Sequence, residues 1–340
     1  MRKLITRRGT EHSLPLFLPV YQPQSPIVPL SVWGELQSVE GCILNAFFLY
    51  KNREIRKLFG NGLTLREYIK FDGLVMTDSG AFQALTGPLL LSNKAIVTFQ
   101  EMIKTDIASP LDLISPPGEN RTTAEQKLIV TLKRVREALD LTPGCILAGV
   151  QQGGRFPDLR RRSLEGLMEI GIEYLAIGSL VPFFNKNHDL KFVGAVLREA
   201  RRIAGPQMPI HVYGAGDPVE LPFLVALGAD IFDSSSYAHY AKERWYMTPY
   251  GALRDPGPLM TGEYTCRCPA CQAQVPGWEI MDDLPSLAWH NMWTIFETIR
   301  LIREALAAHR LDELLKDIIE VHQRWFPESL LPASWSTLHE

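Results

Sequence analysis

Short apolar segments recur along the chain and alternate with longer amphipathic segments. We interpret eight of the short segments as buried β-strands, because they are compact apolar runs with β-branched or aromatic residues, bounded by polar or turn-forming ones. These segments are 16–20, 42–47, 74–78, 111–115, 146–151, 174–177, 210–213 and 230–233. The pattern therefore predicts a protein with a repeated strand unit.

The segments between most of these strands have the apolar spacing of helices. Residues 122–140 begin with Thr122 and Glu125, which have the spacing of a helix capping box. Residues 158–170 and 190–204 also place apolar side chains on one helical face. A regular alternation of strand and helix predicts a parallel sheet.

Eight strand–helix units favour a closed (β/α)8 TIM barrel over an open doubly wound sheet, since no GxGxxG motif follows the first strand. An irregular α/β domain is the alternative. Residues 255–285 interrupt the alternation with prolines, glycines and cysteines, and a long helix is expected over 287–309. We predict a catalytic barrel over residues 1–254, with a small zinc-binding segment and C-terminal helices over residues 255–340.

Three of the five cysteines lie close together, as Cys266, Cys268 and Cys271. His290 follows them in the predicted long helix. Three thiolates and one imidazole are the ligand set of a closed, structural zinc site. The sequence therefore predicts bound Zn²⁺, and the alternative is a group of reduced surface cysteines near an unrelated histidine.

Asp78 and Asp233 each end an apolar strand segment. In a TIM barrel the carboxyl ends of the strands form the rim that carries the chemistry. Two carboxylates that face one cavity allow one to act as a nucleophile and the other to transfer a proton. Each aspartate could instead cap the turn that follows it, and spacing alone does not decide between the two readings.

Composition and charge limit the choice of partners. The chain has 340 residues, of which 46% are hydrophobic and 21% charged, as is typical of a globular protein. The net charge of −3 means that a nucleic acid would have to be bound by a local basic patch. Because no apolar run has the length of a signal peptide or a membrane span, we expect a cytoplasmic protein with no membrane partner.

Five segments together resemble the tRNA-guanine transglycosylases. They are VMTDSGAFQ at 75–83, VQQGG at 150–154, AIGSL at 176–180, FDSSSYA at 232–238, and the cysteine cluster with its histidine. Their order also agrees, and the resemblance covers roughly residues 16–303. It implies a pentosyltransferase that removes guanine from a polynucleotide and inserts a 7-deazaguanine base.

The resemblance also implies roles for individual residues. Asp233 would attack the ribose C1′ and form a covalent glycosyl intermediate, and Asp78 would be the general acid and base. Asp112 would read the edge of the guanine. The other implied pocket residues are Phe82 and Tyr213, stacked on the base, and Ser79, Gln152, Gly178 and Ser179, which line the pocket. Ordinary barrel packing is the alternative reading for the two aromatic residues.

The amino-acid sequences of several segments resemble the archaeosine-type enzymes more than the queuosine-type enzymes. This resemblance favours preQ0 over preQ1 as the incoming base, and tRNA as the polynucleotide substrate. The archaeal enzymes carry C-terminal RNA-binding domains, whereas this sequence ends at Glu340. Relatives that modify DNA also have a core without that extension, so the same exchange in DNA is the alternative. A non-catalytic subunit of a heteromeric transglycosylase and a barrel glycosidase are further alternatives. Either a homodimer or a complex with an accessory protein fits the sequence.

Basic residues near the predicted rim are candidates for contact with the nucleic acid. Lys242 and Arg244 follow the predicted nucleophile segment, so we expect them to contact the phosphate backbone. The run 160–162 consists of three arginines inside a predicted helix. A solvated outer face is the favoured reading of that run, and phosphate contact is the alternative.

Overall fold

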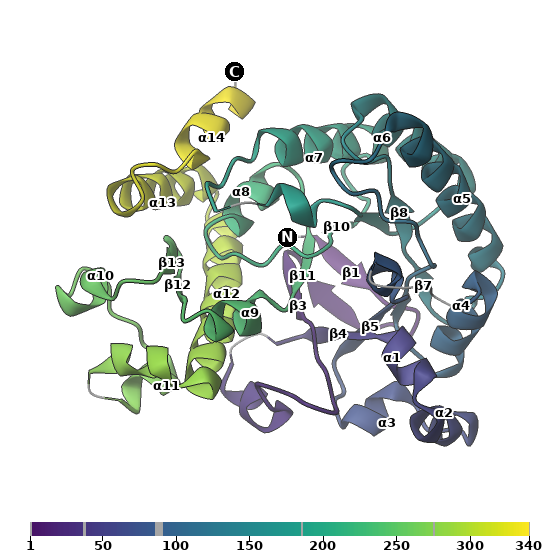
Figure 1. Ribbon diagram of the computed structural model, residues 1–340, viewed down its shortest axis with the longest axis horizontal. Helices are drawn as coiled ribbons and strands as arrows, with labels where there is room; N and C mark the ends of the chain where they lie inside the picture. The colour runs from purple at the N-terminus through teal and green to yellow at the C-terminus, as the bar shows by residue number, and fades with distance from the viewer. Residues whose placement is uncertain (1, 37–38, 86–90, 185, 275, 340) are drawn as a thin grey trace.

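The computed structural model describes residues 2–36, 39–85, 91–184, 186–274 and 276–339. Parallel strands form the centre of the molecule (Figure 1). They are β3 (Leu16–Pro19), β4 (Gly41–Asn45), β5 (Leu74–Asp78), β6 (Ile107–Ala108), β7 (Ile146–Leu147), β8 (Gly149–Gln151), β9 (Leu175–Ile177), β10 (Ile210–Val212) and β11 (Ile231–Ser234).

These strands close into one barrel. One sheet has the order β3-β11-β10-β9-β8 and the other has the order β4-β5-β6-β7. At one join, only Ala148 separates β7 from β8, so the two are parts of a single strand position. At the other join, a parallel bridge links Val20 to Ile43. The (β/α)8 barrel predicted from the sequence is therefore confirmed.

Alternate residues of the strands fill the barrel interior. Leu18, Ile43 and Ile231 belong to one buried apolar cluster there. A hairpin of β1 (Lys3–Ile5) and β2 (Glu11–Ser13) precedes the barrel, and its Leu4 joins the same cluster. The interior is thus a packed and largely apolar core, and the carboxyl ends of the strands form the rim on which a barrel places its chemistry.

Helices surround the barrel (Figure 1). They are α1 (Ala46–Lys51), α2 (Arg53–Gly60), α3 (Leu65–Ile69), α4 (Asn93–Met102), α5 (Arg121–Leu139), α6 (Pro157–Ile170), α7 (Lys191–Ala204), α8 (Leu221–Ala226) and α9 (Ser236–Lys242). Short 3-10 helices are η1 (Leu30–Glu35), η2 (Ala81–Leu85), η3 (Val181–Phe183) and η4 (Gly277–Asp282). The capping box expected at Thr122 is wrong, because Asn120 is the N-cap of α5 and accepts from the Thr123 N–H at 3.0 Å.

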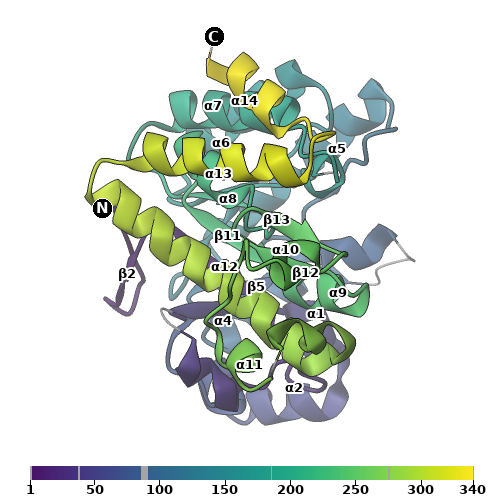
Figure 2. The same ribbon diagram turned by 90° about the vertical axis from the view of Figure 1, so that its left-hand side faces the viewer.

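The C-terminal part of the chain packs on one side of the barrel. It consists of β12 (Tyr246–Thr248), β13 (Gly251–Leu253), α10 (Gly257–Met260), α11 (Pro269–Gln272), α12 (Leu284–Ala307), α13 (Leu311–Trp325) and α14 (Leu331–His339). The long helix α12 contacts β3, α8 and α9, and Figure 2 shows it crossing the side of the barrel. Among the described residues, no helix combines the length and the hydropathy of a membrane span.

The fourth strand lies earlier in the chain than the apolar pattern predicted. It is β6, whereas the predicted segment 111–115 is an irregular stretch that follows it. The Leu113 N–H donates to the Thr131 side chain at 3.1 Å, in place of a neighbouring strand. Pro110 has no N–H to donate to a strand ladder. The pattern identified a buried segment correctly, but apolar character alone did not show that it was irregular.

Candidate active site and metal centre

Polar side chains occupy the last inward positions of several strands. Asn45 and Asp78 end β4 and β5, Gln152 follows β8, Tyr213 follows β10, and Asp233 lies in β11. These positions continue the inward alternation of the apolar interior towards the carboxyl ends of the strands. The barrel therefore gathers on one rim residues that are far apart in the sequence.

The Asp78 carboxyl group is poised to exchange a proton near neutral pH. Burial raises its pKa to about 7, and the negative charges of Asp233 and Asp112 raise it further, against the Gly80 N–H and the Asn45 amide. The Asn45 Nδ2 lies 3.3 Å from each oxygen of this carboxyl group. A carboxyl group with such a pKa can act as an acid in one step and as a base in the next.

Asp233 is held at one of its two oxygens. Its side chain is only 13% exposed, and Oδ1 lies 2.9 Å from the Nε2 of His211. The same Oδ1 accepts a hydrogen bond from the Gly214 N–H at 3.2 Å. Gly214 has a φ of 77°, and a Cβ at this position would lie 2.3 Å from the Val181 side chain. Glycine is therefore needed for this backbone to present its N–H to the carboxylate.

Asp112, Gln152 and Ser179 form a hydrogen-bonded chain. The Gln152 Nε2 donates to the Asp112 Oδ2 at 2.6 Å, and the Ser179 hydroxyl donates to the Gln152 Oε1 at 2.6 Å. The hydroxyl of Ser179 also accepts from the Ser115 N–H at 3.0 Å. Burial raises the pKa of Asp112 to about 6, against the hydrogen bond from Gln152. A Cβ at Gly178 would lie 2.5 Å from the Gln152 amide nitrogen, so this close packing requires glycine.

The other pocket residues predicted from the sequence differ in how deeply they are buried. Ser79 is buried directly after Asp78. Tyr213 is half-buried, and its hydroxyl lies 2.8 Å from the Ser109 hydroxyl. Phe82 is 60% exposed on η2. No ring contact between Phe82 and Tyr213 occurs in the part of the chain that the structure describes. The structure thus places one aromatic ring in the wall and the other at the rim.

The expectation that the arginine run is solvated is wrong for Arg160. This residue is only 2% exposed. Its Nε donates to the Gly154 carbonyl at 2.7 Å, and its Nη1 donates to the Gly178 carbonyl at 3.1 Å. Burial lowers its pKa to about 9. Arg160 therefore supports, from behind, the backbone segments that carry the Asp112–Gln152–Ser179 chain.

A signal for the burial of Arg160 was present in the sequence. Leu164 and Leu167, four and seven residues later, are buried on the same side of α6. Arg161 and Arg162 are exposed, as expected for the outer face. The position on the helix, rather than the residue type, decides which of the three arginines is buried.

Two further polar residues near Asp233 were missed by the sequence analysis. His211 and Tyr174 are fully buried, and the Tyr174 hydroxyl lies 2.8 Å from the His211 Nδ1. The other ring nitrogen of His211 is the one beside Asp233, and it has no well-directed hydrogen bond among the described residues. A histidine inside the apolar segment 210–213 was the available signal.

Lys242 and Arg244 are exposed at the end of α9 and just beyond it. Arg244 forms an ion pair with Asp282 on η4. Close by in the sequence, the ring of Trp245 lies under the Lys186 ammonium group, 5.4 Å from the ring centroid. The structure thus places the two predicted phosphate contacts on the surface, with one of them already paired to a carboxylate.

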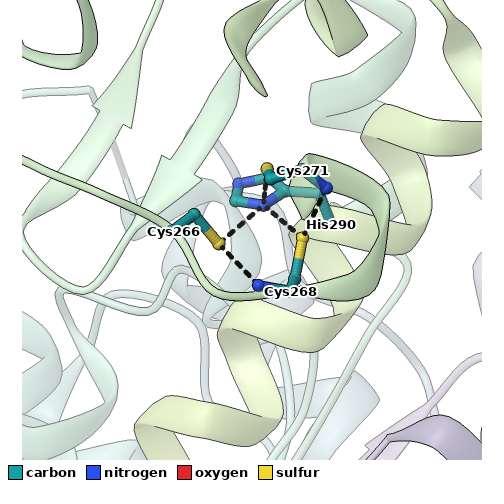
Figure 3. A group of neighbouring side chains, drawn as sticks. All are labelled: Cys266, Cys268, Cys271 and His290. Atoms are coloured by element: carbon teal, nitrogen blue, oxygen red, sulfur yellow. Dashed lines mark hydrogen bonds between the residues drawn. The ribbon is translucent and has the colours of Figure 1, made fainter. Parts of the chain in front are cut away.

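Cys266, Cys268, Cys271 and His290 converge on one buried point (Figure 3). The His290 Nδ1 lies 3.4, 3.4 and 3.5 Å from the three sulfur atoms. Around a tetrahedral zinc ion, bonds of about 2.3 Å to sulfur and about 2.0–2.1 Å to nitrogen would separate these atoms by about 3.5 Å. The four side chains therefore have the geometry and the donor set to hold a metal ion.

Neighbouring groups orient the histidine of this cluster. The His290 Nε2 donates to the Met247 carbonyl at 2.9 Å, which leaves Nδ1 as the ligand atom. The Tyr246 ring stacks on the imidazole with centroids 3.7 Å apart, and its hydroxyl lies 3.1 Å from the Cys271 sulfur. The ligand orientation is therefore set by the surrounding fold.

The metal centre is connected to the active-site rim through α12. Asn291, the residue after His290, donates to the Tyr237 carbonyl of α9 at 3.3 Å. Its side-chain oxygen accepts from the Met247 N–H at 2.9 Å. Because α9 begins three residues after Asp233, the two sites share a structural support.

Comparison with known proteins agrees with this geometry. Residues 2–324 match the protein family described as queuine tRNA-ribosyltransferase. The chain is 35% identical over 323 residues to the tRNA-guanine(15) transglycosylase of Methanopyrus kandleri, which covers 93% of this chain and 69% of that relative. It is 33% identical over 327 residues to the protein of the same name from Pyrococcus furiosus, covering 94% of this chain and 54% of that relative. The chain thus spans about half to two thirds of the length of these relatives.

Proposed function

Because this chain belongs to the queuine tRNA-ribosyltransferase family, we propose that it exchanges a guanine in tRNA for the 7-deazaguanine preQ0. The activity of that family is transfer of a ribosyl group, a pentosyltransferase reaction. The observation that carries the proposal is the pair of carboxyl groups, Asp78 and Asp233, beside the Asp112–Gln152–Ser179 chain. This arrangement supplies a nucleophile, a proton donor and a site for a purine edge.

In the first step Asp233 attacks the ribose C1′ of the target nucleotide. A bond forms between a carboxylate oxygen and C1′, the bond between C1′ and the guanine nitrogen breaks, and its electron pair leaves with the guanine. Asp78, protonated in part near its pKa of about 7, gives a proton to the departing base. The product is a glycosyl ester on Asp233 and a free guanine.

In the second step the incoming base replaces the ester. Asp78, now a carboxylate, takes the proton from the ring nitrogen of preQ0, and that nitrogen attacks C1′. The ester bond breaks, and its electron pair restores the Asp233 carboxylate. The two displacements leave C1′ with its original configuration, as in retaining glycosidases.

Base recognition is assigned to Asp112 with Gln152 and Ser179. Carboxylate and amide oxygens accept hydrogen bonds from the N–H groups that purines and 7-deazaguanines share. Tyr213 and Phe82 provide aromatic surfaces on which a flipped base can stack. The preference for preQ0 rests on the resemblance of the segments around Asp112 and Asp233 to the archaeosine-type enzymes.

The metal centre is assigned as a structural zinc site. Its three thiolates and one imidazole fit zinc, and all four ligand positions are taken by protein. When bound, the ion would cross-link the segment around Cys268 to α12 at His290 and would take no part in the chemistry. The ligands lie in a buried cluster of their own.

Exchange of labelled guanine tests the proposed function. The purified protein is incubated with radiolabelled guanine and either bulk tRNA or duplex DNA, with Asp233→Asn as the inactive control. We expect label in tRNA only, and none with the variant. Label in DNA alone would move the substrate to DNA, and no label in either pool would contradict an active transglycosylase.

A further inference from the structure

Most of the described side chains in the barrel interior below the active site are apolar. Ile43, Val150 and Ile231 represent its inward-facing residues, all of which lie in one buried apolar cluster. His211 and Tyr174 face the same interior, and both are fully buried. Since buried polar groups are costly without partners, their presence in this layer calls for a specific contact.

The two side chains form a line that ends at Asp233. The Tyr174 hydroxyl lies 2.8 Å from the His211 Nδ1, and the His211 Nε2 lies 2.9 Å from the Asp233 Oδ1. That Nε2 makes no well-directed hydrogen bond within the described residues, and the Asp233 Oδ1 is the acceptor that lies beside it. The two atoms are within hydrogen-bond distance of each other.

The positions of the hydrogens follow from this order. A ring nitrogen 2.9 Å from a carboxylate oxygen must carry its hydrogen, because two lone pairs would repel each other. In the neutral imidazole the other nitrogen, Nδ1, is then an acceptor, so the Tyr174 hydroxyl donates to it. The hydrogen bond from Tyr174 thus stabilises the tautomer of His211 that presents an N–H to Asp233.

We propose that His211, held by Tyr174, is a positioning residue that orients the Asp233 carboxylate for attack on C1′. This inference rests on the proposed function. The Gly214 N–H and the His211 Nε2 both lie at Oδ1, which assigns the attack on C1′ to Oδ2. His211 contacts the nucleophile and not the residues assigned to the base pocket.

The two donors also act when the glycosyl ester breaks. In the intermediate Oδ1 is the carbonyl oxygen of the ester, and negative charge returns to the carboxyl group as the bond from Oδ2 to C1′ breaks. Fixed donors at a site where charge develops lower the barrier, and loss of one such donor costs about 10²–10³-fold in kcat in well-studied cases. Because Gly214 still donates after loss of His211, a smaller loss is expected here.

Three single variants, and a double variant of His211→Leu with Tyr174→Phe, separate this role from simple packing. His211→Leu removes the donor but retains an apolar side chain, His211→Gln places an amide N–H near the position of Nε2, and Tyr174→Phe removes only the hydroxyl. For each we would measure the single-turnover rate of adduct formation with tRNA, the KM for guanine, and the melting temperature.

We expect His211→Leu to slow adduct formation by about 10- to 100-fold, because a carboxylate that is no longer held in its attack geometry loses a factor of this size, with little change in the KM for guanine. His211→Gln should restore most of the rate. Introduced into the parent protein, Tyr174→Phe should slow adduct formation. Added to His211→Leu, it should have no further effect on that rate, because Tyr174 acts through His211.

An unchanged rate in His211→Leu, or independent effects of the two substitutions in the double variant, would overturn the inference. If His211→Leu does not fold, the comparison of His211→Gln and Tyr174→Phe with the parent decides. Equal loss in those two variants would assign both residues to packing. Absence of the adduct in the parent protein would instead count against the proposed function, so the two failures are distinguishable.

Discussion

The ionisation of Asp78 sets the pH range of the proposed first step. Its pKa is raised to about 7, chiefly by burial, and the acid form must donate a proton to the departing guanine. As the pH rises through about 7, the acid form disappears, so the rate of adduct formation should fall about tenfold per pH unit above it. This fall is the alkaline limb of the pH–rate profile. Single-turnover rates measured between pH 5.5 and 9, on the order of one point per half pH unit, would determine its position.

A variant of Asn45 tests the assignment of that limb to Asp78. Asn45 donates to the ionised carboxylate, so Asn45→Ser should raise the pKa of Asp78 and move the limb to higher pH. Serine keeps a capping oxygen at the start of α1, where the Asn45 side chain accepts from the Phe48 N–H. A limb at the same pH in parent and variant would assign it to another group.

The proposed role of Asp112 predicts a loss of base affinity. Asp112→Ala should weaken binding of free guanine and preQ0 by about 1–3 kcal/mol, roughly 5- to 150-fold, because purine donors would be left unpaired in a buried site. Isothermal titration of the free bases measures it. Asp158→Asn, on the exposed end of α6, is the matched control and should bind like the parent. Unchanged affinity in Asp112→Ala would remove this residue from the pocket.

At the residue scale, the sequence indicated candidate groups but not their partners. Asp78 and Asp233 stood out because a carboxylate at the end of an apolar strand is unusual. The pairing of Asp233 with His211 was not predictable, since it joins neighbouring strands through a side-chain contact that no sequence spacing reveals. The burial of Arg160 was not predicted either. A charged residue is expected on the outer face of a helix, but Arg160 lies on the apolar face of α6.

At the scale of elements, periodicity predicted most of the barrel. The helix expected over 158–170 is α6, and the strand expected over 74–78 is β5, because both have strong apolar periodicity. The prediction of a strand over residues 111–115 is wrong because side chains from neighbouring helices, such as Thr131, accept hydrogen bonds from the backbone of this segment. Hydrogen bonds of that kind leave no periodic signal in the sequence.

The link between α12 and the metal ligands predicts that the ion supports the C-terminal elements. Cys268→Ser should abolish metal binding and lower the melting temperature by on the order of 10 °C, since 1 kcal/mol corresponds to about 2–4 °C in domains of this size class. Metal analysis and thermal unfolding measure the two effects. Cys145→Ala removes a buried thiol outside the cluster and should keep its metal. A metal-free protein with unchanged melting would contradict a structural site.

At the scale of the whole molecule, the net charge of −3 requires that a nucleic acid be bound by a few local cations. We propose Lys242 and Arg244 as two of them. Replacing both with alanine should weaken tRNA binding and flatten its log–log salt dependence by about one unit per lost contact. Binding of free guanine should not change.

The matched control for this variant is Arg161→Ala with Arg162→Ala, two exposed arginines on the outer surface of α6. These changes should leave the salt dependence as in the parent. If the Lys242 and Arg244 variant also keeps the parental slope, the nucleic acid lies on another face or contacts a second chain.

The domain boundary predicted between residues 254 and 255 remains a proposal. The helices that follow it contact the barrel along α12 and α13, with α12 against β3 and α13 against α8. The chemistry proposed here depends on the barrel rim, all of whose assigned side chains lie in the described residues.

In the proposed exchange, Asp233 carries the ribose between the two steps. The direct measurement is to quench the protein with tRNA in denaturant, digest the adduct with nuclease and protease, and locate the modified peptide by mass spectrometry. We expect a nucleotide adduct on the peptide that contains Asp233, and its absence in Asp233→Asn. An adduct on Asp78, or guanine exchange with the same rate in Asp233→Asn, would contradict it.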